Sequence, residues 1–195
     1  MSEVRIIGGA WKRSKLPVLD KPGLRPTPDR VRETLFNWLG QDLAGWRCLD
    51  AFAGSGALGF EAASRGAASV VLLERDPALV RQLRAAQQRL QASTVRVEQA
   101  DALAWMRRAA PASFDLVCLD PPFDAGLFEP ALAAARRLLR EDGVLYLEAP
   151  EPWSEPVLAP LGYRLRRQGR AGAVHFHLLQ RDITLAGSPA EEPAS

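Results

Sequence analysis

The chain has 195 residues, of which 47% are hydrophobic and 25% charged, with a formal net charge of +2. This length suits one compact enzyme domain with an appendage, and it is long enough to bury a sizeable core. No stretch approaches the roughly 18–20 apolar residues of a membrane span and the basic N-terminus lacks an apolar signal core, so we expect a cytoplasmic protein. The two cysteines form no C-x-x-C pair, and His175 and His177 lack a third ligand, so no metal is expected.

Positive charge is concentrated in residues 1–40, which we expect to form a basic arm of hairpin, loop and helix that packs on the remaining domain. The arm holds eight Lys or Arg and four acids, a net +4, whereas the other 155 residues hold 17 and 19, a net −2. This favours phosphate contacts to a nucleic acid, although an ordinary solvated basic surface would have the same composition. The residues proposed to contact RNA or to close the site are Lys12, Arg13, Lys15, Arg25 and Thr27.

The arm is predicted to end in a helix. Thr27 is expected to cap this helix, with Pro28 at its first position, where a missing N–H costs nothing. The apolar face that should pack on the main sheet comprises Val31, Leu35, Trp38 and Leu39.

A glycine motif follows the first predicted strand of the main sheet, near 47–52. Gly54, Gly56 and Gly59 satisfy G-x-G-x-x-G before a helix near 57–66, a pattern that lets a cofactor approach the backbone. The next strand, near 69–74, ends at Glu74, twenty residues after Gly54, where an acid can bind ribose hydroxyls. An NAD enzyme would share both features, so they indicate only a nucleoside-containing cofactor.

Further carboxylates follow other predicted strands. The strand near 94–98 leads to Asp101, which suits either an adenine amino group or the cap of a helix near 102–108. Asp50 suits either the amino-acid end of a cofactor or the shaping of the turn. The proposed cofactor-binding residues are Asp50, Phe52, Gly54, Gly56, Glu74, Asp101 and Ala102.

The strand near 114–119 ends at the tetrapeptide Asp120, Pro121, Pro122 and Phe123, which we predict to be catalytic. The Asp120 carboxylate and the Pro121 carbonyl can accept both N–H bonds of a nucleobase amine, and Phe123 can stack on the base. An ordinary turn between strand and helix is the alternative reading of these four residues.

Alternating strands and helices continue to about residue 180. Asp76 and Pro77 should start a helix near 77–91, and a helix near 126–139 should precede a strand at 143–148. Two alternating segments, 163–170 and 173–180, predict a closing antiparallel hairpin. We therefore predict an α/β, Rossmann-like, doubly wound sheet of seven mostly parallel strands, helices on both faces and an antiparallel last strand. Residues 41–183 would form the catalytic domain and 184–195 a disordered tail.

The series of motifs resembles the class I S-adenosylmethionine-dependent methyltransferases, in which D-P-P-F marks transfer to an exocyclic amine. More narrowly, the sequence resembles the RsmD family of bacterial 16S rRNA guanine-N2 methyltransferases over roughly residues 4–180. The segments that carry this resemblance are Arg5–Gly9, Gly23–Thr27, Asp29–Leu39 and Phe52–Gly59. Pro28, the stretch 11–15 and the tail after Ile183 depart from the family pattern.

The resemblance implies S-adenosylmethionine as methyl donor and a guanine in 16S rRNA of the small ribosomal subunit as acceptor. It leaves open which guanine is modified and whether naked rRNA is a substrate. We expect a monomer without metal or membrane partners. The alternatives are a methyltransferase acting on another amine, such as adenine N6 of DNA or a protein amide, and a non-catalytic RNA-binding assembly factor.

Overall fold

A computed structural model describes residues 2–24 and 26–183 of the chain, so Arg25 and the tail at 184–195 lie outside the described residues. The strands are β1 (Ser2–Arg5), β2 (Lys15–Val18), β3 (Arg47–Asp50), β4 (Ser69–Glu74), β5 (Val95–Gln99), β6 (Phe114–Leu119), β7 (Leu139–Ala149), β8 (Tyr163–Ala171) and β9 (Val174–Arg181). The helices are α1 (Asp29–Leu39), α2 (Ala57–Ser64), α3 (Pro77–Arg89), α4 (Ala102–Arg108), α5 (Phe128–Leu138), α6 (Glu155–Leu158) and the 3₁₀ turn η1 (Ala159–Leu161).

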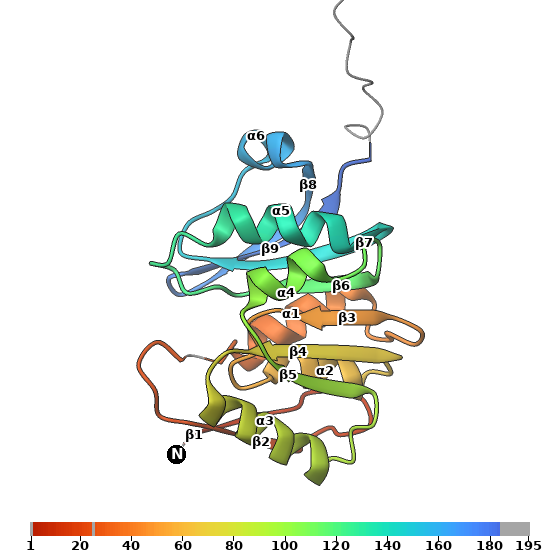
Figure 1. Cartoon of the computed structure of the whole chain (residues 1–195), viewed down its shortest axis with the longest axis vertical. Helices are drawn as coiled ribbons and strands as arrows, with labels where there is room; N and C mark the ends of the chain where they lie inside the picture. Colours follow the sequence, from red (N-terminus) through yellow and green to blue (C-terminus); the bar gives the residue numbers. More distant parts are fainter. Residues whose placement is uncertain (1, 25, 184–195) are drawn as a thin grey trace, which may run out of the picture.

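The main sheet has seven strands within the described ranges, in the order β5-β4-β3-β6-β7-β9-β8. The pairs from β5 to β7 are parallel, whereas β9, the last strand in the chain, runs antiparallel to both β7 and β8. The order reverses between β3 and β6, which is the switch point where doubly wound sheets bind ligands. The predicted fold class is therefore confirmed (Figure 1).

Two hydrophobic clusters cover the two faces of this sheet. One joins α1, α2 and α3 to the side chains of Cys48, Leu72, Cys118 and Tyr146. The other joins α4, α5 and α6 to the side chains of Leu49, Val71, Val117 and Leu147. Because successive strand residues point to opposite faces, each buried strand supplies both clusters. In Figure 1 α4 and α5 cover the near face, and α1 lies behind the sheet.

A buried ion pair joins α1 to α2 and also holds the N-terminal hairpin, because Arg32 Nη1 donates to the Arg5 carbonyl at 2.8 Å. Arg32 and Glu61 are both fully buried, and Arg32 Nη1 lies 3.0 Å from Glu61 Oε2. The same carboxylate accepts the backbone N–H groups of Ile7 and Gly8, each at 2.8 Å. Gly9 has a positive φ of 73°, and a Cβ there would lie 1.8 Å from the Ser64 carbonyl. These contacts attach the basic segment to the domain, while a boundary at residue 40 remains a prediction.

The predicted cap of α1 is wrong. Pro28, not Thr27, occupies the N-cap position, and no side chain caps the helix. The Thr27 hydroxyl instead donates to Glu148, 121 residues further along the chain, because the tertiary fold supplies a buried carboxylate. Of the predicted apolar face, Val31 and Leu35 are buried, whereas Trp38 and Leu39 are only partly buried.

Other expected elements agree with the structure to within a few residues. The predicted bounds of β4, β6 and α4 are confirmed, and Asp76 caps α3 by accepting the N–H groups of Ala78 and Leu79. β7 begins four residues earlier than predicted, at Leu139, and the short α6 and η1 were not predicted. No helix in the described part of the chain is both long and apolar enough to cross a membrane.

Candidate functional site

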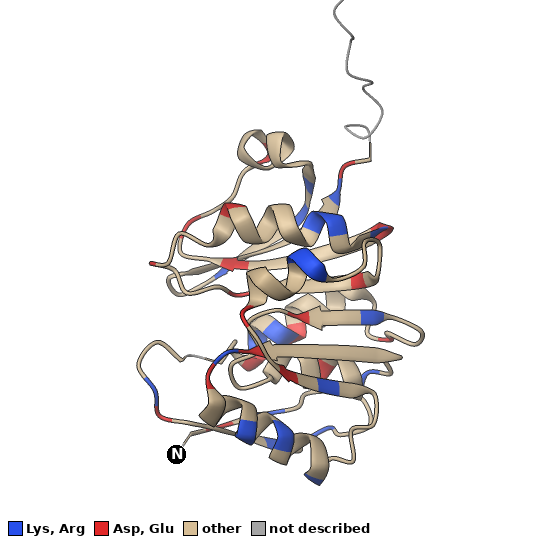
Figure 2. Cartoon of the chain, viewed as in Figure 1, with Lys and Arg blue, Asp and Glu red and all other residues tan. Residues whose placement is uncertain are grey.

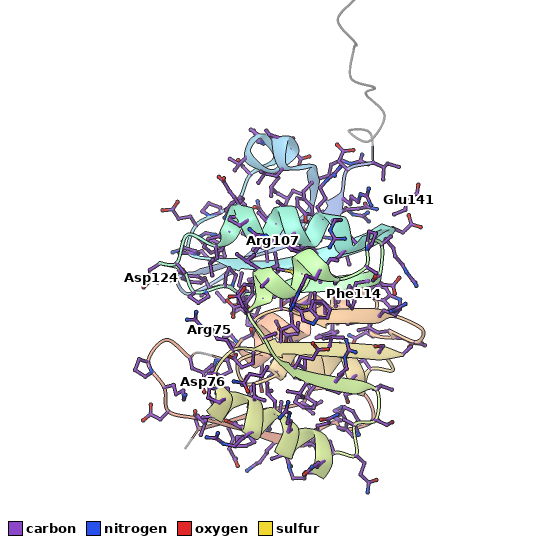
Figure 3. The ribbon with its side chains drawn as sticks, viewed as in Figure 1. Arg75, Asp76, Arg107, Phe114, Asp124 and Glu141 are labelled. Atoms are coloured by element: carbon purple, nitrogen blue, oxygen red, sulfur yellow. The ribbon has the colours of Figure 1, made fainter. Side chains whose placement is uncertain are left out.

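Four carboxylates gather where the central strands end. Asp50, Glu74 and Glu148 lie in or at the ends of β3, β4 and β7, and Asp120 directly follows β6. Since parallel strands end at one edge, these side chains share that edge, and alternation turns them toward the face covered by α1 and α2. In Figure 3 Arg75, Asp76 and Asp124, which follow β4 and β6, lie at this edge, whereas Glu141 lies at the opposite end of β7.

The glycine loop is attached to the acid at the end of β4. Gly54 donates its backbone N–H to Glu74 Oε2 at 3.0 Å, and Asp76 donates its N–H to Oε1 at 2.9 Å. Gly54 and Gly56 both have positive φ, which side chains other than glycine rarely adopt. Each carboxylate oxygen has two lone pairs, so Glu74 can accept further hydrogen bonds from a ribose. Its role toward a cofactor remains a proposal.

Asp50 is buried beneath this loop. Its Oδ2 accepts the backbone N–H of Gly59 at 3.1 Å, and this hydrogen bond ties the turn to the end of β3. Gly59 allows α2 to approach β4, because a Cβ there would lie 2.1 Å from a Leu72 methyl group. Burial raises the pKa of the Asp50 carboxyl from 3.8 to about 7, and the charges of Glu74 and Glu148 add to this rise.

The predicted adenine-binding residues lie after β5. Asp101 is exposed and caps α4 by accepting the Ala104 N–H at 2.8 Å. This is the capping role anticipated from the sequence, and it leaves the second carboxylate oxygen without a hydrogen bond from the described residues. Ala102 is buried, and the partly buried Phe52 packs against the cluster on the α4 and α5 face.

The tetrapeptide that is predicted to be catalytic directly follows β6. Neither oxygen of Asp120 accepts a hydrogen bond from the described residues, and burial and the charges of Glu148 and Asp50 raise its pKa well above the usual range. Pro121 is buried, Pro122 is exposed, and Phe123 has 38% of its surface exposed. The Phe123 ring lies 6.1 Å from that of Phe128. An exposed ring next to unpaired acceptors is the arrangement that a stacked base needs.

Glu148 is a site residue that the sequence reasoning missed. It is 5% exposed, and its Oε1 accepts both the Thr27 hydroxyl at 2.5 Å and the Tyr146 hydroxyl at 2.9 Å. Burial raises its pKa, and these two hydrogen bonds oppose the rise. An acid at the end of an apolar strand was the available signal, the same one that identified Glu74.

The basic residues of the arm lie elsewhere. Lys12, Arg13 and Lys15 are exposed, and Lys15 pairs with Glu3 at 2.8 Å. Trp11 donates its backbone N–H to the Ser64 hydroxyl, so this loop sits at the end of α2 that lies away from the glycine motif. Figure 2 shows positive charge along the hairpin and α3, below the central strands.

Two open depressions follow α1 beside this loop. The larger, of about 480 Å³, is lined by Ile7, Gly8, Gly9, Lys12, Glu33, Asn37, Gln41 and Arg65. The smaller, of about 200 Å³, is lined by Arg5, Ile6, Ile7, Lys12, Arg13, Asp29 and Glu33. Neither Thr27 nor the tetrapeptide at 120–123 lines these depressions, so the structure separates the basic loop from the carboxylate edge.

The chemistry of the edge favours a cationic ligand with hydrogen-bond donors. Four carboxylates converge there, and charge repulsion among them decreases when a positive group binds. Among residues 2–24 and 26–183, no group of three or more His, Cys, Asp or Glu is arranged to hold a metal ion. A sulfonium donor and a base amine match these acceptors better than an anionic ligand does.

Comparisons with known proteins agree with this arrangement. The family model described as conserved hypothetical protein 95 matches residues 4–180. The chain is 43% identical over 183 residues to ribosomal RNA small subunit methyltransferase D of Escherichia coli K12, covering 92% of this chain and 91% of that protein. It is 41% identical to the protein of the same name from Haemophilus influenzae, covering 91% and 94%.

Solved structures show the same fold. The structure named "Putative methyltransferase yhhF from Escherichia coli" superposes with a TM-score of 0.80 at 42% identity, covering 93% of this chain and 99% of that one. A precorrin-6y C5,15-methyltransferase from Geobacter metallireducens has a TM-score of 0.68 at 19% identity, covering 85% and 94%, and supports the fold alone. The fold is that of the class I methyltransferases.

Proposed function

The chain belongs to the RsmD family, and we propose that it transfers a methyl group from S-adenosylmethionine to the exocyclic N2 amine of a guanine in 16S rRNA. The observation that carries this proposal is the Asp120 carboxylate, which has no hydrogen bond from the described residues and follows a strand beside the glycine loop. The names of the relatives support rRNA of the small subunit as substrate. Guanine N2 and the donor rest on the motif chemistry and the sequence resemblance.

The residues of the edge fit the proposed methyl donor. Glu74 would hold the ribose while it anchors the N–H of Gly54, and Asp101 would accept the adenine amine with its free oxygen. Asp50 supports the turn from below. S-adenosylmethionine supplies an electrophilic methyl group on a positively charged sulfur, and converging carboxylates stabilise such a charge.

The remaining residues would prepare the amine for attack. Asp120 and the Pro121 carbonyl accept the two N2–H bonds, which orients the nitrogen lone pair, and Phe123 stacks on the base. The new N–C bond would form as the bond between the methyl group and the donor sulfur breaks, which leaves a neutral thioether and a positive nitrogen. One N–H proton would then leave, with the Asp120 carboxylate as its acceptor. Catalysis then depends mainly on positioning, and no covalent enzyme intermediate is needed.

The rRNA would have to present an unstacked guanine, as enzymes that act on base atoms generally require. Lys12 and Arg13, which are exposed on the arm, would contact phosphates away from the reacting base. The length of α2, 8 residues or about 12 Å at 1.5 Å per residue, separates this loop from the glycine motif. We infer that the enzyme acts as a monomer in the cytoplasm.

The proposal is tested by incubating the protein with radiolabelled S-adenosylmethionine and small subunits, and by identifying the methylated nucleoside by mass spectrometry. We expect N2-methylguanosine in 16S rRNA. If parallel reactions with DNA or protein gave labelled N6-methyladenine or a labelled protein amide instead, the acceptor would be another amine and not guanine N2. Absence of both cofactor binding by calorimetry and methyl transfer would instead favour the non-catalytic assembly factor. A parallel reaction with naked rRNA determines whether the assembled particle is required.

A further inference from the structure

The carboxylate of Glu148 is held in one orientation by two hydroxyl groups. Thr27 and Tyr146 both donate to Oε1, at 2.5 and 2.9 Å. Oε2 accepts no hydrogen bond from the residues that the structure describes, and it is not among their fully buried unpaired atoms, so it keeps part of the 5% exposure of this side chain. An acceptor that is held in place, keeps some exposure and has no donor from the protein is available to a donor supplied by a bound substrate.

This oxygen belongs to the region where the base amine is proposed to bind. Leu119 of β6 pairs with Leu147 of β7, so Asp120 and Glu148 stand side by side one residue further along. Neighbouring strands are about 4.8 Å apart, a separation that adjacent groups of one base can span. The two carboxylates are close enough for the charge of Glu148 to raise the pKa of Asp120.

We propose that Glu148 Oε2 accepts the N1–H of the target guanine while Asp120 and Pro121 hold the neighbouring N2 amine, which makes Glu148 a specificity-determining residue. This inference rests on the proposed methyl transfer to guanine. Guanine presents N1–H and N2–H as adjacent donors. Adenine presents a lone pair at N1 beside its amine, and a carboxylate repels that lone pair. The anchored Glu148 would therefore exclude adenine from the same pocket.

The matched substrate for a test is 2-aminopurine, which keeps the 2-amine of guanine but has a lone pair at N1. The position of the modified guanine is first identified by mass spectrometry of 16S rRNA that the wild-type enzyme has methylated. Small subunits are then assembled from synthetic 16S rRNA carrying guanine or 2-aminopurine at that position. Both substrates compete in one tube, so the ratio of their kcat/KM values does not depend on the fraction of folded enzyme.

We expect the wild-type enzyme to prefer guanine by about a hundredfold or more, because sites built for a hydrogen bond reject analogues that lack it. Glu148→Gln should lower this ratio at least about tenfold, because the negative charge that repels the N1 lone pair is lost in either amide orientation. Glu141→Gln makes the same chemical change at the exposed opposite end of β7 and should keep the wild-type ratio.

An unchanged ratio for Glu148→Gln would overturn the inference while leaving guanine methylation intact. If that variant does not fold, Glu148→Leu removes the acceptor with an apolar side chain, and the same ratio applies to whatever active fraction remains. A wild-type enzyme that methylates neither substrate would refute the proposed function, and the role of Glu148 with it.

Discussion

The hydroxyl of Thr27 donates a 2.5 Å hydrogen bond to the carboxylate of Glu148, joining the residue before α1 to the end of β7 across 121 residues. Both residues are about 5% exposed. The bond places the segment that precedes α1 against the carboxylate edge of the sheet. The N-terminal segment therefore contributes to the candidate site and does not serve only as a basic extension.

Replacing Asp120 should greatly slow catalysis while S-adenosylmethionine still binds. Asp120→Ala removes an acceptor of the amine, and we expect at least a hundredfold lower kcat, of the order that misplacement of a reacting group costs. Asp124→Ala, at an exposed position four residues further along the same loop, is the control. Radiolabelled transfer to small subunits measures kcat, and calorimetry measures S-adenosylmethionine binding. Near-normal methylation by Asp120→Ala would refute its assignment.

Replacing Glu74 should weaken the binding of S-adenosylmethionine itself. The two oxygens of Glu74 accept the backbone N–H groups of Gly54 and Asp76. In Glu74→Gln one of these oxygens becomes an amide NH₂ group, which cannot accept that hydrogen bond. Hydrogen bonds to charged groups contribute about 1.5–3 kcal/mol, so we expect roughly 10- to 150-fold weaker binding. Calorimetry with S-adenosylmethionine checks this, with Glu141→Gln as the matched control. Equal affinities for both variants would exclude Glu74 from the cofactor site.

The buried Asp50 predicts a pH-dependent stability. Because its pKa rises from 3.8 to about 7 on folding, the native state keeps a proton that the unfolded state has lost between these values. The free energy of unfolding should therefore fall as pH rises from about 4 to 7, by up to about 4 kcal/mol for this group. Asp50→Asn removes the effect, so its stability relative to wild type should increase over that interval and then level off. Urea unfolding at pH 4–8 tests this, and a pH-independent difference would contradict it.

The buried pair of Arg32 and Glu61 should dominate the attachment of the arm. Glu61→Ala leaves the buried Arg32 guanidinium with only the partly exposed Asp29 as an acidic partner, and removes the acceptor of Arg65 and of the Ile7 and Gly8 N–H groups. Removing one partner of a buried ion pair typically costs about 3–5 kcal/mol. Glu3→Ala breaks the exposed pair with Lys15 and should cost less than about 1 kcal/mol. Urea unfolding compares the two variants. Similar losses for both would show that the Glu61 carboxylate does not anchor the arm.

The arm should contribute salt-dependent affinity for RNA. Replacing Lys12 and Arg13 by Gln should weaken binding to small subunits and reduce the slope of log K against log salt by about 1.4–1.8, if each contacts one phosphate. Lys15→Gln should do less, because Glu3 already pairs with that ammonium group. Arg107→Gln, exposed on the opposite face of the sheet, is the control (Figure 3). An unchanged slope would show that Lys12 and Arg13 do not contact RNA phosphates.

The elements predicted best are those with the most regular local pattern. The bounds of β4 and β6 follow from uninterrupted apolar runs, and the start of α3 follows from Asp76 and Pro77. The short α6 and η1 offered neither sufficient length nor clear periodicity. The wrong role for Thr27 has a different cause, since a local capping rule cannot anticipate an acceptor supplied by β7.

The sequence by itself determined the alternation of strands and helices, the glycine motif and the acids that follow β4, β5 and β6, because these depend on neighbouring residues. Only the tertiary structure decided that Glu148 joins Asp120 at one edge, that Thr27 orients Glu148, and that Arg32 pairs with Glu61. Such contacts arise from strand order and helix packing, which bring distant residues together. They leave no periodic trace in the sequence, and the function of the site depends on them.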